Sequence, residues 1–376
     1  MPRPAFTIGI EEEYLMVDRV TRDLVPDLPK GFFDDCEQAL GPQVAHEFMR
    51  SQLEVGTKVS RTVQEAQADL ALLRSTIAEL ALEYGVAPIS ASTHPFASHG
   101  AQQHTDKTRY NALAESMGAV VRRLLISGMH VHVAIEDRDL RIDLMNQVLY
   151  FLPHLLALST SSPFWEGDVT GLKSYRTSVF RALPRTGLPD EFHSWADYER
   201  HIGTLTNAGV IEDATRLWWD LRPSARYPTL EMRSSDICTR LDDGITIAAL
   251  YLSLLAMLYR RRLGNQRWRT YSRMLINENI WRAQRYGMDE GLIDFGRGAV
   301  VPFADLVDEV IELVREDADE LGCLDEVLGA RDIVTRGTSA HRQVRVYEEA
   351  VAAGANTQEA LIAVVDFLIE ETVRGL

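Results

Sequence analysis

Three consecutive carboxylates, Glu11, Glu12 and Glu13, stand in a segment whose apolar residues alternate as they do in a β-strand. The alternation over Ile8–Met16 predicts a strand with Glu11 and Glu13 side by side on one face. Two like charges this close repel each other unless water or a cation separates them. Their hard oxygen ligands suit Mg²⁺ or Mn²⁺, whereas the plainer interpretation is a solvated edge of charge. Glu12 falls on the apolar face, where it needs a buried partner or a bulge.

Other segments carry polar residues that could reach the same face. Glu47 and Glu54 are seven positions apart in a second predicted strand, roughly Val44–Val59, which puts them on opposite faces of a regular strand, and a bulge between them could bring both to one side. Two later pairs have the spacing of two that places residues on one strand face. These pairs are His130 with His132, and Glu231 with Arg233. Taken singly, the first pair is more often structural than a ligand, and the second is as readily a cross-strand ion pair.

Together these groups would line one face of a sheet at high cost if nothing were bound there. The residues concerned are Glu11, Glu13, Glu54, His130, Glu231 and Arg233. The face is better explained as the floor of a cleft for divalent cations and a phosphate chain. Carboxylates outnumber imidazoles, which favours Mg²⁺ over zinc, and an arginine beside them suits γ-phosphate recognition. No P-loop or dinucleotide fingerprint is present, so a nucleotide is expected on the sheet.

The remaining pattern predicts the elements that hold these residues. Capping-box spacing from Thr62 to Glu65 starts a helix that Gly85 closes, and the chain after Asp242 is mostly helical. The other expected elements are strands over Val86–Ala91, Leu124–Ile135 and Leu230–Arg233, and a helix over Leu140–Leu158. Strands early and helices late predict an α+β fold with a mostly antiparallel sheet backed by helices. We expect one domain over residues 1–376, strand-rich over 1–235 and helix-rich over 236–376.

Composition narrows the class of protein. A formal net charge of −16 over 376 residues argues against non-specific nucleic-acid binding. Three scattered cysteines favour a reducing compartment, and no signal peptide is visible, so a cytoplasmic protein is expected. The apolar segment Ile245–Tyr259 is too short to span a bilayer and is interpreted as a core helix, so no membrane association is expected. That helix would serve a dimer equally well, which leaves a homo-oligomer open.

Several motifs in order resemble one family, the bacterial carboxylate–amine ligases related to glutamate–cysteine ligase, and in particular their type-2 branch. The matching segments are Gly9–Tyr14, Ser51–Glu54, Gly128–Val133, Ser162–Trp165, Thr170–Arg176, Asp220–Ser224, Thr229–Arg233 and Glu278–Arg282. The resemblance implies a catalytic core similar to glutamine synthetase, a curved antiparallel sheet with ATP and divalent metals on its concave face. It also implies two steps, in which ATP converts a carboxylate to an acyl phosphate and an amine then displaces phosphate.

The resemblance also assigns roles to residues. It implies metal ligands at Glu11, Glu13, Glu47, Glu54, His130 and Glu231. It makes Glu231 and Arg233 the catalytic residues, with Arg233 on the transferred phosphate, and gives Arg176 a substrate carboxylate. His132 matches the pattern as a binding residue without a defined role. Because an acyl phosphate must be shielded from water, a lid is expected from Thr93–Asp106 or Ser162–Lys173.

The sequence leaves the substrates and two alternative functions open. Glutamate is the leading acid and cysteine or another amine its partner, both small molecules. A metal-dependent amide hydrolase built on His130 and His132 is the first alternative, although zinc hydrolases usually recruit fewer carboxylates. A non-catalytic relative that binds nucleotide is the second, and its signature would be the loss of acidic ligands.

Overall fold

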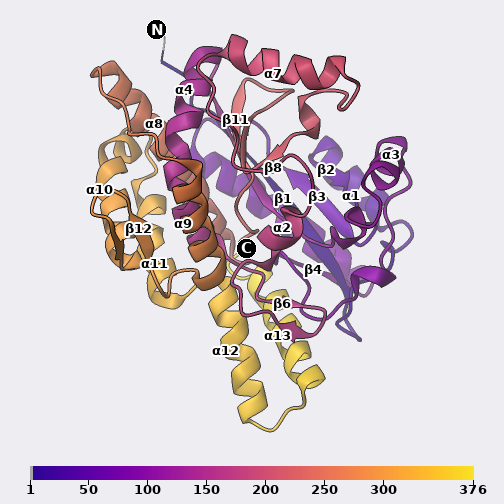
Figure 1. Cartoon of the computed structure of the whole chain (residues 1–376). Helices are drawn as coiled ribbons and strands as arrows, with labels where there is room; N and C mark the ends of the chain where they lie inside the picture. Colours follow the sequence, from indigo (N-terminus) through magenta and orange to yellow (C-terminus); the bar gives the residue numbers. More distant parts are fainter. Residues whose placement is uncertain (1–2) are drawn as a thin grey trace.

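One antiparallel sheet forms the centre of the protein, as the computed structural model shows (Figure 1). The structure describes residues 3–376, apart from the side chains of Arg109 and Arg122. The strands of this sheet are β1 (Ile8–Asp18), β2 (Val44–His46), β3 (Gln52–Gly56), β4 (Val86–Ile89), β5 (Met129–Ala134), β10 (Leu221–Pro223) and β11 (Thr229–Met232). Their order is β10-β11-β5-β1-β3-β2, and β4 pairs with the second half of β1 beyond the end of β5.

Helices surround this sheet, and three two-stranded sheets stand in the connections. The helices are α1 (Phe32–Leu40), α2 (Val63–Glu83), α3 (Thr108–Met117), α4 (Arg138–Val148), α5 (Leu152–Ser159), α6 (Tyr175–Phe180), α7 (Trp195–Asn207), α8 (Leu241–Leu263), α9 (Arg273–Tyr286), α10 (Phe303–Glu320), α11 (Leu324–Arg336), α12 (Ser339–Ala352) and α13 (Thr357–Thr372). The small sheets pair β6 (Phe164–Trp165) with β7 (Asp168–Val169), β8 (Thr186–Gly187) with β9 (Trp218–Trp219), and β12 (Leu292–Asp294) with β13 (Ala299–Val301). The predicted α+β fold is confirmed.

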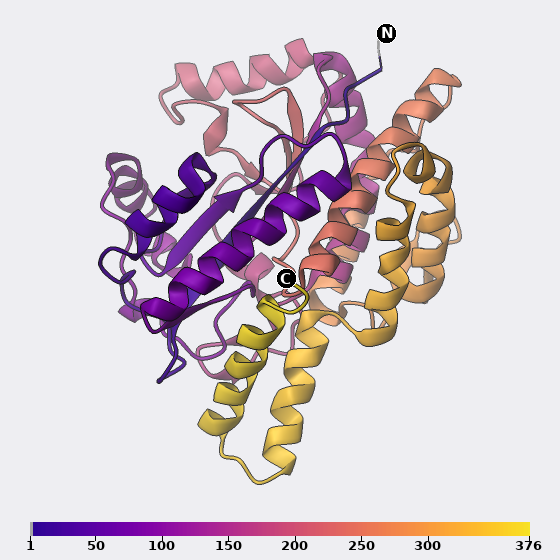
Figure 2. The ribbon, with the colours of Figure 1, turned by 180° about the vertical axis from the view of Figure 1, so that it is seen from behind.

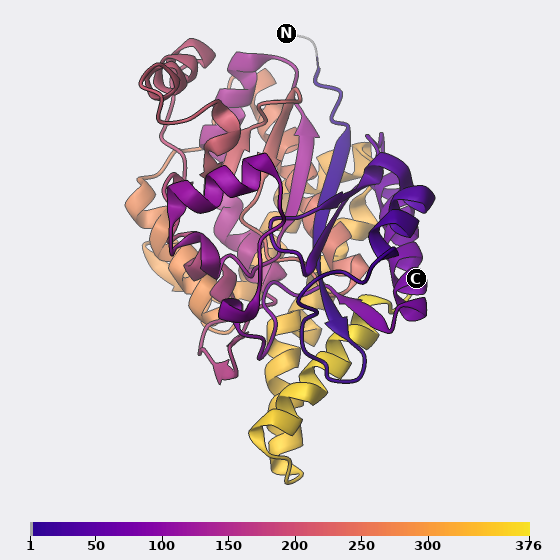
Figure 3. The same ribbon diagram turned by 90° about the vertical axis from the view of Figure 1, so that its right-hand side faces the viewer.

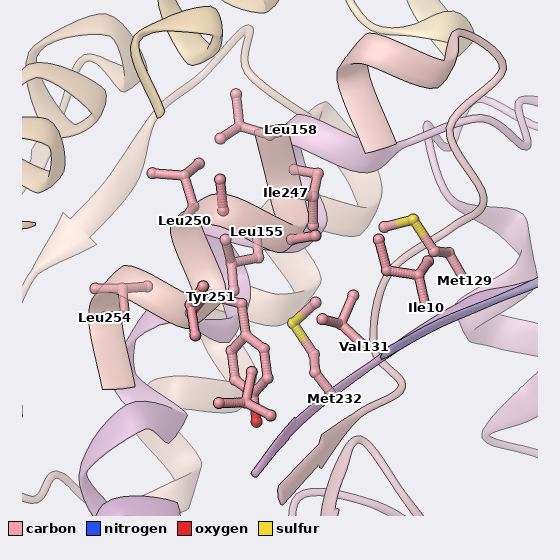
Figure 4. Packing of buried hydrophobic residues seen from close by; sticks show 14 of the residues in the cluster. Ile10, Met129, Val131, Leu155, Leu158, Met232, Ile247, Leu250, Tyr251 and Leu254 are labelled. Atoms are coloured by element: carbon pink, nitrogen blue, oxygen red, sulfur yellow. The ribbon is translucent and has the colours of Figure 1, made fainter. Parts of the chain in front are cut away.

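Two helices cover the apolar face of the sheet. Figure 2 shows α2 lying across the back of the strands, with α8 beside it. In Figure 4, Ile10, Val131 and Met232 point from the sheet toward α8, where Tyr251 also donates a hydrogen bond to the Leu230 carbonyl at 3.2 Å. Helix α8 is long and apolar enough to cross a membrane, but 94% of its most apolar window is buried inside the protein. It is therefore the core helix that the sequence predicts for Ile245–Tyr259.

Three predicted elements are interrupted. The strand expected over Val44–Val59 is the hairpin β2–β3, because the chain reverses between His46 and Gln52. The strand expected over Leu124–Ile135 begins only at Met129. The helix expected over Leu140–Leu158 divides into α4, one 3-10 turn and α5, because Pro153 cannot donate to the preceding turn.

Glu12 has a buried partner on the apolar face. The Arg74 guanidinium on α2 donates to both of its carboxylate oxygens, at 2.7 and 2.6 Å, and Tyr14 donates a third hydrogen bond at 2.6 Å. Arg74 also donates to the carbonyls of Cys238 and Thr239, which precede α8. All of these side chains are buried. The ion pair thus ties the central strand to α2 and to the start of α8, and it leaves Glu11 and Glu13 on the opposite face.

The last two helices extend away from the sheet. Figure 3 shows α12 and α13 as a hairpin that projects below the rest of the protein. Its base is fastened where Ala340 donates to the Thr160 carbonyl and Thr372 accepts from the Ser90 amide. Buried leucines and valines of α13 pack with Ile89 of β4 and with the end of β1.

Candidate active site

The register of the sheet brings most of the predicted residues onto one face. Glu11 lies opposite His130 in the pairing of β1 with β5, and Glu13 lies opposite Glu54 in the pairing of β1 with β3. His132 lies opposite Glu231 in the pairing of β5 with β11. Directly paired residues point to the same side of a sheet. The carboxylates and imidazoles therefore form a continuous polar surface on the face away from α2.

Glu11 sits between the two histidines. Its carboxylate lies 3.1 Å from His130 Nδ1 and 3.4 Å from His132 Nε2. Burial alone would raise the pKa of Glu11, but the hydrogen bond with His130 and the close approach of both imidazoles outweigh it and hold this pKa well below its usual range. Burial and the Arg233 charge lower the pKa of His130 to about 4, whereas contact with Glu11 and Glu231 raises the pKa of His132 against the effect of burial.

Glu231 is held between two arginines. Arg222 on β10 donates to both carboxylate oxygens, at 2.9 and 3.1 Å, and Arg233 donates to Oε1. Burial would raise the pKa of Glu231, but the charges of Arg233 and Arg222 lower it far below its usual value. Arg233 also lies 3.3 Å from His130 Nδ1. Both oxygens of the Glu231 carboxylate therefore accept hydrogen bonds from arginines.

The other half contains carboxylates in excess. Glu47 follows β2 and interacts with the Glu54 carboxylate across the hairpin, so the reversal of the chain, rather than a bulge, brings the two together. Burial raises the pKa of Glu47 to about 7, with Glu13 adding to the rise. Burial and the Glu47 charge raise the pKa of Glu54 well above normal, and burial raises that of Glu13 against Arg176 and Arg233. The carboxylates of Glu13, Glu47 and Glu54 therefore repel one another, because too few positive charges lie beside them.

These donors have the character of a divalent-cation site. Glu11, His132 and Glu231 each offer one ligand atom, and these three atoms lie within 4.8 Å of one another. His130 lies beside this trio, in contact with Glu11 and Arg233. Oxygen donors with one or two imidazoles suit Mg²⁺ or Mn²⁺, and Glu13, Glu47 and Glu54 offer further carboxylate oxygens in the other half of the surface. The residues present therefore fit the metal that the sequence predicts.

Arg176 reaches the edge of this surface from α6. Its side chain is 4% exposed, and Nη2 donates to the Arg233 carbonyl at 3.2 Å, whereas Nε has no hydrogen-bond partner among the described residues. Gly128 leaves the room for it, since a Cβ atom there would lie 2.4 Å from Nη2. The Gly128 amide also donates to Glu13 Oε2 at 2.7 Å. The Glu13 amide donates to the Gly128 carbonyl at 3.2 Å, so the Gly128 amide bonds to the Glu13 side chain in place of its backbone, and β5 begins at the next residue.

Two residues at the site were not predicted. Arg222 belongs to the matching segment Asp220–Ser224, but only the pairing of β10 with β11 shows that it lies opposite Glu231. Asp220 accepts from Arg181 at 2.8 Å, and its carbonyl accepts the Arg233 amide at 2.8 Å. The segment Asp220–Ser224 therefore supplies residues that hold Arg233 and Glu231 in place. The sequence shows this motif but not which residues it contacts.

Comparison with known sequences places the chain among ligases. A sequence model of glutamate–cysteine ligase family 2 matches residues 7–366. A protein of Rhodospirillum rubrum named "Putative glutamate–cysteine ligase 2" is 61% identical over 100% of this chain and 98% of its own length. A protein of the same name from Paracoccus denitrificans is 52% identical over 99% of both chains.

Solved structures with the same fold are more distant in sequence. Glutamate–cysteine ligase of Francisella tularensis, solved in complex with AMP, aligns with a TM-score of 0.68 at 14% identity, over 100% of this chain and 90% of that one. A bifunctional glutathione synthetase of Pasteurella multocida aligns with a TM-score of 0.69 at 15% identity, over 97% of this chain and 52% of that one. The chain belongs to glutamate–cysteine ligase family 2, and it is an ATP-dependent ligase that joins a carboxylate to an amine.

Proposed function

We propose that the protein forms a γ-glutamyl-type amide through an acyl phosphate, with glutamate as the leading acid and cysteine or another small amine as its partner. The observation that carries the proposal is the convergence of Glu11, Glu54, His130, Glu231 and Arg233 on one sheet face. In the first step, a carboxylate oxygen bonds to the γ-phosphorus of ATP while ADP leaves. In the second, the amine nitrogen bonds to the acyl carbon, phosphate leaves with its electron pair, and the nitrogen loses a proton.

The metal ligands proposed are Glu11, Glu13, Glu47, Glu54, His130 and Glu231, with His132 added by its place beside Glu11. When bound, Mg²⁺ or Mn²⁺ would neutralise the phosphate oxygens and hold them in line for transfer. Glu231 orients the guanidinium of Arg233, which is positioned to stabilise charge on the γ-phosphoryl group. Arg222 holds Glu231 from the other side.

Arg176 is proposed to bind the carboxylate of the acid substrate. A buried guanidinium normally uses most of its five N–H donors, but Arg176 makes one hydrogen bond to a carbonyl and leaves Nε unpaired within the described chain. A substrate carboxylate would supply the acceptors that are lacking, beside Arg233 where the phosphate is transferred. The loops Thr93–Asp106 and Ser162–Lys173 remain the proposed lid.

Nucleotide products distinguish this function from its alternatives. The protein is incubated with ATP, Mg²⁺ and a matrix of acids and amines, and the nucleotides are separated. We expect ADP that appears only when a carboxylate is present. AMP would instead indicate adenylation, amide cleavage without ATP would indicate the hydrolase, and bound ATP without turnover would indicate the non-catalytic relative. Family membership favours the ligase over the hydrolase, and the acidic residues gathered on the sheet favour it over the non-catalytic relative.

Divalent cations should stabilise the free protein because they relieve the repulsion among Glu13, Glu47 and Glu54. With the cation at a hundred times its Kd, one site adds about 2.7 kcal/mol to the free energy of unfolding. The measurement is the melting temperature in MgCl₂ or MnCl₂, with and without ADP, against NaCl at equal ionic strength. Glu54→Gln should lose most of the increase. An unchanged melting temperature in both metals, with ADP present, would contradict the site.

Gly128→Ala should weaken binding of the acid substrate. The added Cβ would overlap the Arg176 guanidinium, which must then move by about an ångström, and a displacement of that size at a reacting centre costs on the order of 10²-fold. We expect a higher KM for the acid and an unchanged KM for ATP, measured by ADP release. Gly203→Ala is the control, because a Cβ on Gly203 meets nothing within 4 Å. Equal KM values in both variants would remove Arg176 from the acid subsite.

The cysteines, the net charge and helix α8 bear on the location and assembly of the protein. Cys36, Cys238 and Cys323 are buried and free, as expected in a reducing compartment, which supports the cytoplasm. Non-specific nucleic-acid binding remains disfavoured by the net charge. Helix α8 is occupied by the core, so a homo-oligomer would have to use another surface.

A further inference from the structure

Asp236 is a buried acid that none of the roles above uses. It follows β11 by four residues, its exposed fraction is 0%, and its backbone pairs with that of Gly128. Three donors surround its carboxylate. The Ser161 amide and the Ser162 hydroxyl donate to Oδ2 at 2.9 and 2.7 Å, and the Ser174 hydroxyl donates to Oδ1 at 2.7 Å. A buried acid with this many partners fixes the segments that supply them.

Those segments are the two ends of one loop. Ser162 begins and Ser174 follows the stretch Ser162–Lys173 that is proposed as a lid, and the two serines also form a backbone bridge. The Ser162 amide donates to the Lys173 carbonyl at 3.2 Å, and the Tyr175 amide donates to the Ser162 carbonyl at 2.9 Å. Asp236 thus closes the base of the loop at the point where α6 begins.

The same contacts reach Arg176. The Ser162 hydroxyl donates to Asp236 and accepts the Arg176 amide at 3.1 Å, so it joins the carboxylate to the backbone of Arg176. The charges of Asp236 and Glu13 both act on the buried Arg176 guanidinium. Because the Arg176 side chain has few partners of its own, its placement depends on the backbone from which it extends.

We propose that Asp236 is a positioning residue for the acid substrate: through Ser162 and Ser174 it fixes the base of the loop and the start of α6, and so sets where Arg176 presents its guanidinium. This inference rests on the proposed role of Arg176. It assigns the carboxylate substrate, and not the nucleotide, as the ligand whose binding depends on Asp236.

Asp236→Asn tests the proposal with little change in volume. An ionised carboxylate offers about four acceptor sites, whereas an amide offers one oxygen and turns an NH₂ group toward the donors. The acid is the one identified in the matrix of acids and amines, and L-glutamate is tested first. We expect its KM to rise about tenfold or more, because a contact made in both ground and transition states acts on KM. The KM for ATP should stay within about twofold. Asp317→Asn is the control, because Asp317 is equally buried but binds Arg260 on α8.

A double-mutant cycle separates positioning from general damage. In an Arg176→Met background, Asp236→Asn should raise the acid KM no further, because the group it positions is gone. An equal rise in that background, or an acid KM for Asp236→Asn within about twofold of the wild type, would overturn the proposal. If Asp236→Asn does not fold, Ser162→Ala carries the same test, since it removes the bridging hydroxyl and leaves the charge in place.

Hydrogen exchange tests the positioning independently of turnover. Asp236→Asn should speed amide exchange over residues 162–176, and Asp317→Asn should not. If the wild type released no ADP with any acid, the proposed function would fail, while faster exchange in this segment would still support the positioning contacts. Unchanged exchange over residues 162–176 would show that Asp236 does not hold them.

Discussion

Glu231→Gln should lower ATP-dependent ADP release by about 10³-fold or more, the range seen when a group that stabilises transferred phosphate is lost. The change removes a proposed metal ligand. It also removes the negative charge that pairs with Arg222 and Arg233. The amide keeps only one acceptor oxygen, so the two arginines can no longer both donate as they do to the carboxylate. Arg233 would then lose its orientation toward the phosphate at the same time. The measurement is steady-state ADP release with saturating Mg²⁺ and substrates.

The chain contains a matched control for this variant. Glu371, at the end of α13, is buried to a similar degree, with its side chain 1% exposed against 3% for Glu231, and it is also paired with two arginines, Arg342 and Arg374. Glu371→Gln should therefore cost similar stability and leave ADP release unchanged. Circular dichroism and melting temperature establish that both variants are folded. Turnover near the wild-type rate in folded Glu231→Gln would remove Glu231 from the site.

Arg74→Met should be the most destabilising single change that we predict, lowering the free energy of unfolding by about 3–5 kcal/mol. The substitution leaves the Glu12 carboxylate buried on the apolar face, with Tyr14 as its one remaining hydrogen-bond donor among those described. It also removes the guanidinium that donates hydrogen bonds to the carbonyls of Cys238 and Thr239, just before α8. Urea unfolding followed by tryptophan fluorescence measures the loss.

The double variant Glu12→Leu with Arg74→Met distinguishes an uncompensated charge from lost packing. Removing both charges leaves apolar groups of similar size, so much of the lost stability should return. A double variant no more stable than Arg74→Met would mean that packing around the guanidinium, rather than the unpaired Glu12, accounts for the loss. A single variant that loses less than about 1 kcal/mol would contradict the structural role of the pair.

Periodicity in the amino-acid sequence determines much of the secondary structure of this protein. The alternation in Ile8–Met16 placed Glu11 and Glu13 on one face and Glu12 on the other, because side chains of a strand alternate by covalent geometry alone. Val63–Glu83 and the core helix α8 were visible for the same reason, with apolar residues at helical spacing. The local sequence pattern does not predict the ends of elements that depend on a tertiary contact or on a proline. Examples are the start of β5 after Gly128 and the break between α4 and α5 at Pro153.

Only the tertiary structure decided which of these residues meet. Pairing of β1 with β3 sets Glu13 beside Glu54, 41 positions apart in the sequence, and pairing of β1 with β5 sets Glu11 beside His130, 119 positions apart. The hairpin that joins Glu47 to Glu54, the Arg222 clamp on Glu231 and the hold of Asp236 on Ser162 likewise have no signal in local spacing. A sequence records which side chains share a face of one strand. The order and register of the strands decide how those faces combine, because they are fixed by burial and hydrogen bonding over the whole sheet.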